Sequence, residues 1–214
     1  MNTLTTSDMV KMVSTMGDII IAKEVYFCEL DSAAGDGDFG MSLAKGFKIL
    51  RKEWEALPKD EIGNFLRECG MLLTEHCGGA SGPIWGSAFR SAGKSSAGKS
   101  EITLSAFAEL MQAAVEGIQK RGNAKLGDKT LLDALIPTVE ALKNGAAAGE
   151  DLLDAMQKGA EAAVAGAEKT KDIVATKGRA SYVGERSLNY PDAGAMALGI
   201  IFTGVYNAMK SSQI

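Results

Sequence analysis

Three aspartates stand in a short glycine-rich stretch, LDSAAGDGDFGMSLAKGF, at residues 30–47. Asp31, Asp36 and Asp38 alternate there with glycines, directly before a segment with helical spacing. If the carboxylates converge to about 4 Å, each like-charged pair costs on the order of 4 kcal/mol at an effective dielectric constant near 20. A cation removes that repulsion, and a small set of carboxylate oxygens suits Mg²⁺, which usually completes its shell with water and substrate phosphates. The stretch therefore indicates a magnesium site that receives a phosphorylated ligand.

Two other interpretations of these aspartates have to be weighed. A calcium-binding EF-hand loop beginning at Asp36 would place Met41 where the invariant glycine belongs and Phe47 where the bidentate glutamate belongs, so that motif fails. The remaining alternative is structural, because Asp and Gly commonly turn the chain and cap the next helix. The residues alone leave the magnesium site and the helix cap open.

Two further loops contain residues suited to phosphate. In GGASGPIWG, residues 78–86, small side chains precede Pro83 at a helix start, where free backbone N–H groups and the helix dipole attract anions. In KGRASYVGERS, Lys177, Arg179 and Arg186 stand in a glycine-containing loop, and arginine grips phosphate oxygens with paired donors. An ordinary turn and solvated surface charge are the competing interpretations, the latter favoured for Lys177.

One stretch imitates a nucleotide-binding motif. GKSSAGKS, residues 93–100, matches the Walker A pattern, including its lysine at Lys99. A P-loop follows a buried strand and opens a helix, whereas this stretch follows a helical pattern, and a Walker B strand is missing from the sequence. A basic surface loop explains the same residues.

The cysteines and the histidine indicate no metal centre. Cys28, Cys69 and Cys77 form no C-x-x-C pair, which is typical of reduced thiols in a cytoplasmic protein. His76 adjoins Cys77, but zinc needs four ligands, and other Cys or His residues at ligand spacing are lacking.

The elements that must position these loops are helices. Apolar residues recur at helical spacing, and strand-like alternation is rare. The 214 residues, 46% of them hydrophobic, suffice for one core, so a single domain over 1–214 is expected, and the net charge of -4 does not suggest nucleic acid. Charges within the first 24 residues argue against an export signal, and the uncharged run after Asp192 falls short of a membrane span of about 20 residues. The predicted fold is an all-α bundle with helices at 6–29, 40–56, 60–77, 82–93, 103–121, 128–144, 150–175 and 192–210.

Taken together, the loops resemble those of a known family. GDGDxG, GGASGPxxG, GDKT, KGRASYxGERS and PDxGA occur in that order, and the chain resembles the nucleotide-binding L subunit of dihydroxyacetone kinase over nearly its whole length. The resemblance implies an eight-helix antiparallel barrel with the nucleotide at one end. It also implies that Asp31, Asp36 and Asp38 hold Mg²⁺, two ions in the family, against the phosphates of ADP or ATP. The nucleotide contacts that it implies are Phe39, Gly40, Met41, Ser42, Ala80, Ser81, Gly122, Leu131, Arg179, Asp192, Ala193 and Gly194.

Two positions depart from the family pattern. The family usually has His after the last aspartate and Asn three positions later, where this chain has Phe39 and Ser42. Phenylalanine donates no side-chain hydrogen bond, so a polar contact near the phosphates is lost or replaced.

The resemblance also implies a function and partners. The subunit would hold the phosphoryl donor, while a separate K subunit carries the ketose on a histidine, so the resemblance places no catalytic residue on this chain. Bound ADP would be recharged by a phosphohistidine protein of the sugar phosphotransferase system, or ATP would exchange as a substrate. The alternative is a nucleotide-binding regulatory protein of the same fold whose catalysis is weakened by Phe39.

Overall fold

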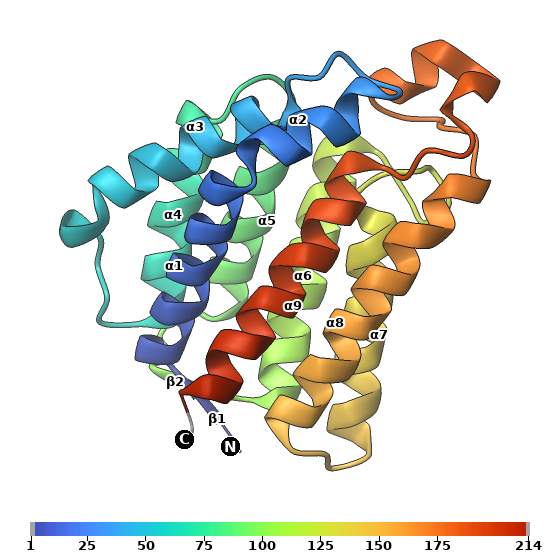
Figure 1. Cartoon of the computed structure of the whole chain (residues 1–214). Helices are drawn as coiled ribbons and strands as arrows, with labels where there is room; N and C mark the ends of the chain where they lie inside the picture. The colour runs from blue at the N-terminus through green and yellow to red at the C-terminus, as the bar shows by residue number, and fades with distance from the viewer. Residues whose placement is uncertain (1–2, 213–214) are drawn as a thin grey trace.

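The computed structural model describes residues 3–212 and shows an almost entirely helical protein (Figure 1). Its described part contains short 3-10 turns η1 (Trp54–Ala56) and η2 (Thr170–Asp172), a longer 3-10 segment η3 (Arg179–Ser187), and strands β1 (Thr3–Thr5) and β2 (Glu101–Thr103). The α-helices are α1 (Thr6–Ala22), α2 (Glu24–Ser32), α3 (Phe39–Lys52), α4 (Ile62–His76), α5 (Ser81–Ser95), α6 (Leu104–Gly122), α7 (Leu132–Ala147), α8 (Leu152–Lys169) and α9 (Ala193–Ser211).

Eight of these helices form a closed ring. From α3 to α9 each helix packs on the next, and α1 closes the ring by packing on both α3 and α9. Successive helices from α4 onward run in opposite directions, while α2 lies across one end against α3 and α9 (Figure 1). The all-α, eight-helix antiparallel barrel predicted above is therefore confirmed.

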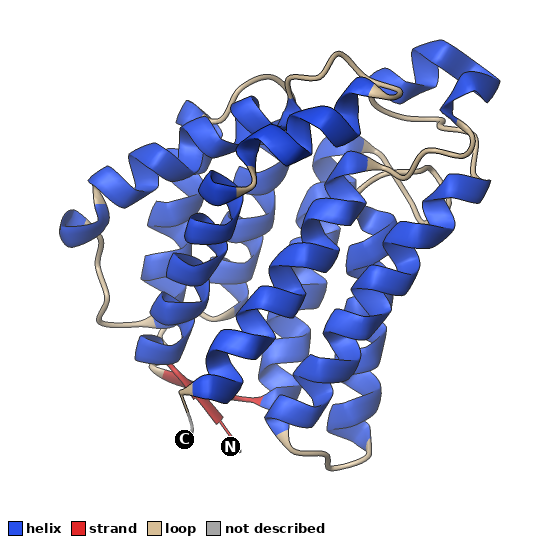
Figure 2. Ribbon diagram, in the orientation of Figure 1, coloured by secondary structure: helices blue, strands red, loops and turns tan. Residues whose placement is uncertain are grey.

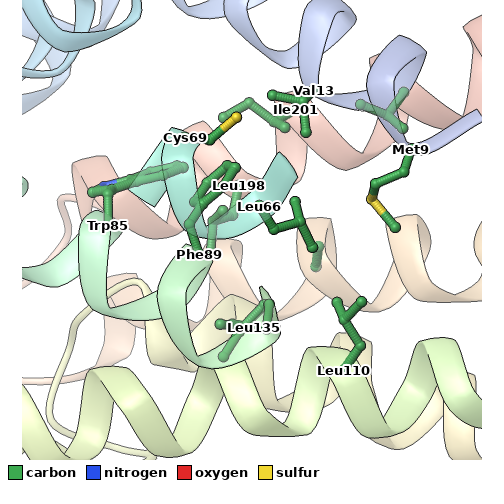
Figure 3. Close-up of a cluster of buried hydrophobic side chains, with 14 of the residues drawn as sticks. Met9, Val13, Leu66, Cys69, Trp85, Phe89, Leu110, Leu135, Leu198 and Ile201 are labelled. Carbon is green, nitrogen blue, oxygen red and sulfur yellow. The ribbon is translucent and has the colours of Figure 1, made fainter. Parts of the chain in front are cut away.

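The interior of the ring is apolar. Met9, Val13, Leu110, Leu135 and Ile201, which come from four different helices, are all at most 4% exposed and converge on the barrel axis (Figure 3). They do not fill the ring completely, since a cavity with apolar walls remains beside Trp85 and Phe89. Burial of these faces is the main force that holds the helices in the ring.

The two short strands close the end of the barrel opposite α2 (Figure 2). They pair antiparallel, with Leu4 opposite Ile102, and both of these side chains are buried. Thr5 then caps α1 in a reciprocal capping box with Asp8, which fixes the start of that helix. The sequence pattern had not indicated this pairing, because each strand has three residues and too little alternation to register.

The predicted helix at 6–29 is wrong in its second half. It ends at Ala22, and after Lys23 the chain begins α2 in a new direction. The turn contains no glycine or proline. It buries Phe27 completely under the end of the barrel and carries Asp31 toward the start of α3.

The predicted helix at 150–175 is also too long. The α-helix ends at Lys169, and η2 follows it. The carbonyl oxygens of Thr170 and Ile173, which a longer helix would use internally, accept hydrogen bonds from the side chain of Lys129 instead. A long-range contact therefore overrides the local helical pattern.

Candidate metal and phosphate site

The loops singled out in the sequence gather at the end of the barrel that α2 covers (Figure 1). The N-termini of α3, α5, α7 and α9 all open toward this end, because the helices alternate in direction. Each N-terminus carries a partial positive charge and backbone N–H groups that no earlier turn satisfies. Four such termini at one end make a surface suited to polyphosphate.

The three aspartates do converge. One carboxylate oxygen from each of Asp31, Asp36 and Asp38 lies within 4.8 Å of the other two. Asp31 belongs to the last turn of α2, Asp36 to the following loop, and Asp38 to the residue before α3. The loop turns through Gly37, whose φ of +74° is in the left-handed region that favours glycine.

The helix-cap interpretation accounts for only part of this cluster, because Asp31 Oδ2 accepts a long hydrogen bond, 3.4 Å, from Phe39 N at the start of α3. Asp38 occupies the N-cap of α3, yet its side chain accepts no capping hydrogen bond. The Asp31 carboxylate points into the loop, where its Oδ2 accepts from the backbone N–H of Gly37 at 2.9 Å. Three carboxylates with oxygen atoms to spare form a donor set that fits Mg²⁺.

The electrostatics of Asp31 also favour a cation. Burial raises the pKa of its carboxyl, and the neighbouring Asp36 and Asp38 carboxylates raise it further against the effect of its backbone hydrogen bonds. Asp31 moreover stands at the C-terminal end of α2, where the helix dipole disfavours a negative charge. A bound cation would offset the burial of the Asp31 charge, its repulsion by Asp36 and Asp38 and the unfavourable helix dipole.

Close backbone packing holds the aspartates together. A Cβ added to Gly40 would lie 2.8 Å from the backbone nitrogen of Cys28 and still closer to the carbonyl oxygen of Glu24. Only glycine therefore allows the first turn of α3 to approach α2 this closely. This contact sets the distance between Asp31 and Asp38.

Arg179 reaches the cluster from the other side of the site. It begins η3, and its Nε lies 2.8 Å from Oδ2 of Asp36 in a partly exposed ion pair. The guanidinium retains further donors that could bind phosphate oxygens. Arg186, in the same segment, is exposed.

The other residues carried over from the resemblance lie at the same end. Phe39 to Ser42 form the first turn of α3, Ala80 and Ser81 begin α5, and Gly122 ends α6. Leu131 immediately precedes α7, and Asp192 to Gly194 begin α9. A Cβ on Gly194 would lie 3.2 Å from the Leu131 side chain, so the α7 and α9 termini adjoin. The structure thus brings all of these positions to one end of the barrel.

Phe39 turns its ring toward the protein interior. The ring packs against Phe27, with centroids 6.2 Å apart, while its backbone N–H points toward Asp31. The side chain thus completes the apolar contact between α2 and α3. A histidine at this position would meet the same apolar ring.

Asp192 connects α9 to this site. Its Oδ2 accepts a hydrogen bond from Ala195 N at 2.8 Å, which caps α9. Burial raises the pKa of this carboxyl to about 7, and Asp133 and Asp31 add to the rise, while the capping bond and Lys129 oppose it. The group therefore titrates near neutral pH in the absence of ligands.

Sequence reasoning missed the buried polar residues that support the loops. Asp133 accepts from the backbone N–H groups of Gly127 and Thr130, and Lys129 donates to carbonyls of the 170–190 segment. Both Asp133 and Lys129 are at most 4% exposed. The GDKT motif was the available signal, but charged residues in a loop ordinarily indicate solvent exposure.

The Walker-like stretch lies far from this site. Residues 93–100 end α5 and lead into β2, at the barrel end that the strands close (Figure 2). The carbonyl oxygen of Lys99 accepts from Ile62 N at 2.9 Å. The stretch therefore contacts the start of α4 through its backbone, and it neither follows a strand nor begins a helix as a P-loop does.

Two features of the described residues bear on other expectations. Cys28, Cys69 and Cys77 are free thiols. None of the helices within residues 3–212 has the length and apolar character that crossing a bilayer requires.

Comparisons with known proteins agree with this geometry. The model of the DAK2 domain family matches residues 33–207. The chain is 32% identical to the ADP-binding subunit DhaL of the PEP-dependent dihydroxyacetone kinase of Escherichia coli, over 91% of this chain and 93% of that subunit. It is also 32% identical to the ADP-binding subunit DhaL of the PTS-dependent dihydroxyacetone kinase of Lactococcus lactis, over 93% of this chain and 95% of that subunit.

A solved structure shows the same fold. The dihydroxyacetone kinase of C. freundii, in complex with AMP-PNP and Mg²⁺, superposes with a TM-score of 0.73 at 25% identity. The match covers 92% of this chain and 33% of that kinase, so this chain corresponds to about a third of the larger enzyme.

Proposed function

Because the chain belongs to the DAK2 domain family, we propose that it is the phosphoryl-donor subunit of a kinase for dihydroxyacetone or a related short-chain ketose. In this proposal it holds Mg²⁺ with ADP or ATP and passes the phosphoryl group to a ketose on a separate K subunit. The ADP-binding subunits named above, which match this chain over nearly their whole length, support it.

The observation that carries the proposal is the position of the acidic cluster. Asp31, Asp36 and Asp38 converge where four helix N-termini open, and Arg179 stands beside them. Carboxylates alone would repel a nucleotide, and helix termini alone would bind any anion. Together they select a polyphosphate that arrives with a divalent cation.

Each part of the site has a role in the proposed reaction. The three carboxylates would hold Mg²⁺, and we propose two ions because the family to which the sequence is similar has two. When bound, the metal neutralises phosphate charge and orients the transferred group. The backbone N–H groups at the start of α5, around Ala80 and Ser81, and the cation Arg179 would bind the remaining phosphate oxygens. Phosphoryl transfer asks a protein mainly for such alignment and charge neutralisation.

The proposed cycle requires two partners. A phosphohistidine protein of the sugar phosphotransferase system would pass its phosphoryl group to ADP and so form ATP on this subunit. ATP would then phosphorylate a ketose hydroxyl on the K subunit, which releases a proton and restores ADP. The dependence on PEP or on the phosphotransferase system in the relatives' names supports this order. The three free thiols support a cytoplasmic setting for it.

Native mass spectrometry and reconstitution test the proposal. The purified chain should retain ADP and magnesium and release both in EDTA. Together with a K subunit, dihydroxyacetone and a phosphorylated phosphotransferase-system protein, it should form dihydroxyacetone phosphate. Failure to bind ADP at any magnesium concentration would refute the assignment.

Phe39 favours one alternative, a nucleotide-binding regulatory protein with weakened catalysis. Its ring packs on Phe27 and leaves no side-chain donor at the position where the family usually has histidine. The same reconstitution separates the two functions. Tight ADP binding without sugar phosphorylation, with a reference L subunit active in the same assay, would favour the regulator.

A further inference from the structure

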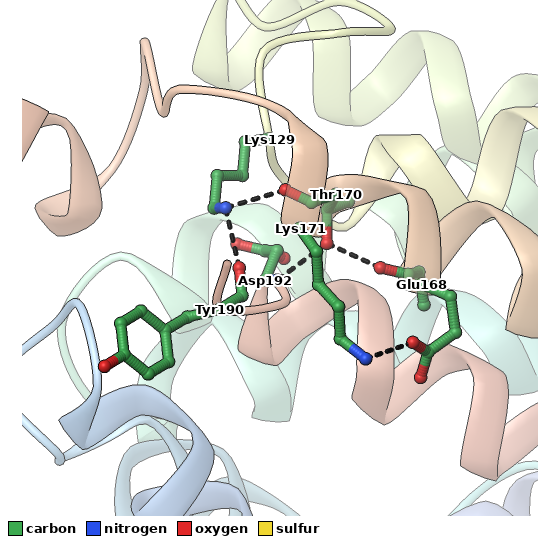
Figure 4. Close-up of polar contacts among 7 residues, drawn as sticks. Lys129, Glu168, Thr170, Lys171, Tyr190 and Asp192 are labelled. Carbon is green, nitrogen blue, oxygen red and sulfur yellow. Dashed lines mark hydrogen bonds and ion pairs between the residues drawn. The ribbon is translucent and has the colours of Figure 1, made fainter. Parts of the chain in front are cut away.

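A buried lysine stands at the base of the segment that carries Arg179. The Lys129 residue is 2% exposed. Its Nζ donates to the backbone carbonyl oxygens of Thr170, Ile173, Ser187 and Tyr190 at 2.7, 3.1, 2.8 and 2.7 Å. An ammonium group has three N–H donors, so these four acceptors surround it much as oxygens surround a coordinated cation. Figure 4 shows two of them, the carbonyl oxygens of Thr170 and Tyr190, beside the Lys129 ammonium.

The four acceptors come from the two sides of one loop. Thr170 and Ile173 precede the 174–186 segment, and Ser187 and Tyr190 follow it. The ammonium therefore holds together the two chain segments at the base of the loop, residues 170–173 and 187–190. The segment above it contains η3 and, with it, Arg179, whose Nε lies 2.8 Å from Asp36.

The other bonds at this base are few. Ala175 N donates to Ser187 Oγ at 3.0 Å, Asn189 N donates to Lys171 O at 2.8 Å, and Asp192 N donates to Thr170 Oγ1 at 2.8 Å. Without a cation, four carbonyl dipoles would point at one another in a buried space. That arrangement is unfavourable, because each carbonyl would lose a hydrogen bond, and within residues 3–212 only Thr170 O of the four keeps a backbone partner, Ile173 N at 3.2 Å.

The backbone around Lys129 indicates that its placement is specific. Its φ is +61°, in the left-handed region that a lysine rarely adopts. The neighbouring loop is fixed by side chains: Asp128 accepts from Thr176 at 2.7 Å, and Asp133 accepts from Thr130 N at 2.8 Å. The Asp192 carboxylate also attracts the ammonium, which relates the lysine to the start of α9.

We propose that Lys129 is a positioning residue: its ammonium is a built-in cation that closes the base of the 174–186 segment and thereby places Arg179 against the acidic cluster. The role in nucleotide binding rests on the proposed function. The closing of the loop does not, because it follows from contacts within the chain. It also follows that, when Lys129 is replaced by alanine, a free monovalent cation of similar size should occupy the place of the lost ammonium.

Cation replacement in Lys129→Ala tests this role. The full-length variant is compared in equal concentrations of sodium chloride and ammonium chloride, with Lys143→Ala as an exposed-lysine control and Arg179→Ala as a comparison. Hydrogen exchange of residues 174–188 is measured without nucleotide, and Mg-ADP affinity is measured by calorimetry. In sodium, Lys129→Ala should exchange faster at 174–188 while α4 to α6 stay protected, and should bind Mg-ADP at least about tenfold more weakly.

Ammonium should reverse both effects in Lys129→Ala. Ammonium should change neither the hydrogen exchange nor the Mg-ADP affinity of the wild type, Lys143→Ala or Arg179→Ala, because in these proteins the Lys129 ammonium already occupies the space between the four carbonyl oxygens. The proposal would be overturned if residues 174–188 of Lys129→Ala exchanged as slowly as those of the wild type. It would also be overturned if the whole barrel exchanged faster and ammonium had no effect. So would a variant that fails to fold in both salts, since Lys129 would then be a core residue.

The two measurements separate this inference from the proposed function. If wild type binds no Mg-ADP, the proposed function fails, yet exchange at 174–188 still tests the loop closure. If wild type binds Mg-ADP and Lys129→Ala binds it equally well in sodium, the function stands and the positioning role is wrong.

Discussion

The Nε of Arg179 lies 2.8 Å from Oδ2 of Asp36, and this ion pair joins two loops that are distant in the sequence. Both side chains are partly exposed, so the pair contributes little to folding. We expect Arg179→Ala to keep the melting temperature of the ligand-free protein but to weaken Mg-ADP binding about tenfold. Calorimetry measures the affinity, with Arg67→Ala of α4 as the control. Equal affinities in the two variants would exclude Arg179 from phosphate binding.

Asp36→Asn should separate binding from folding more sharply. The change removes one of three mutually repelling carboxylates, so the ligand-free protein should be at least as stable as wild type. Its Mg-ADP affinity should fall by about 100-fold or more, because a neutral amide replaces a charged metal ligand. Lys99→Ala, in the Walker-like stretch, should bind normally. If instead Lys99→Ala lost Mg-ADP affinity and Asp36→Asn kept it, the nucleotide would bind at the other end of the barrel.

Removal of magnesium should abolish the stabilisation by nucleotide. At a ligand concentration about 100 times Kd, binding adds about 2.7 kcal/mol to stability, which for a domain of this size raises Tm by about 5–10 °C. With EDTA the same ADP should give almost no shift, since the acidic cluster then repels its phosphates. Differential scanning calorimetry measures both conditions. An equal shift in EDTA would mean that the carboxylates do not act through a metal.

Gly40→Ala should damage the acidic cluster through the backbone. Its Cβ would lie 2.8 Å from Cys28 N, so α2 and α3 must move apart. We expect a loss of about 3 kcal/mol in the free energy of unfolding, as for other severe overpacking, and a loss of magnesium affinity. The matched control is Gly17→Ala in α1, whose Cβ would meet only Phe47 at 3.5 Å. That change should stabilise the protein by about 0.5–1 kcal/mol, because alanine favours a helix interior. Chemical denaturation measures both, and a stable Gly40→Ala would contradict the packing argument.

Asp192 should make the ligand-free protein less stable as the pH rises toward neutrality. Its pKa is about 7 in the folded protein, against 3.8 for an ordinary aspartate, so the folded state binds the proton more tightly. The resulting stabilisation is complete below pH 4 and is lost as the pH rises through 7. Asp192→Asn keeps a capping oxygen but cannot ionise. Between pH 5 and 8 the melting temperature of the wild type should therefore fall by about 5 °C more than that of Asp192→Asn. Melting curves in EDTA check this, with Asp154→Asn on α8 as the control, and parallel curves for Asp192→Asn and wild type would contradict it.

The features that could be predicted were those encoded over a short stretch of chain. The spacing of apolar residues predicted the helices that form the barrel. The motif of Asp31, Asp36 and Asp38 predicted the carboxylate cluster, because three residues so close in the chain stay close in space. The first helix was predicted past Lys23 because its apolar spacing continues there. The break at that residue depends on what Phe27 packs against, which spacing does not contain.

Local sequence therefore determined where the helices run and which carboxylates meet, since both follow from neighbours along the chain. Only the tertiary structure decided that Arg179 faces Asp36, that α8 stops at Lys169, and that Lys129 lies buried among four carbonyls. The physical reason is that these contacts join segments brought together by closure of the barrel. A charged side chain in a loop stays solvated until the fold supplies oxygens that replace its water.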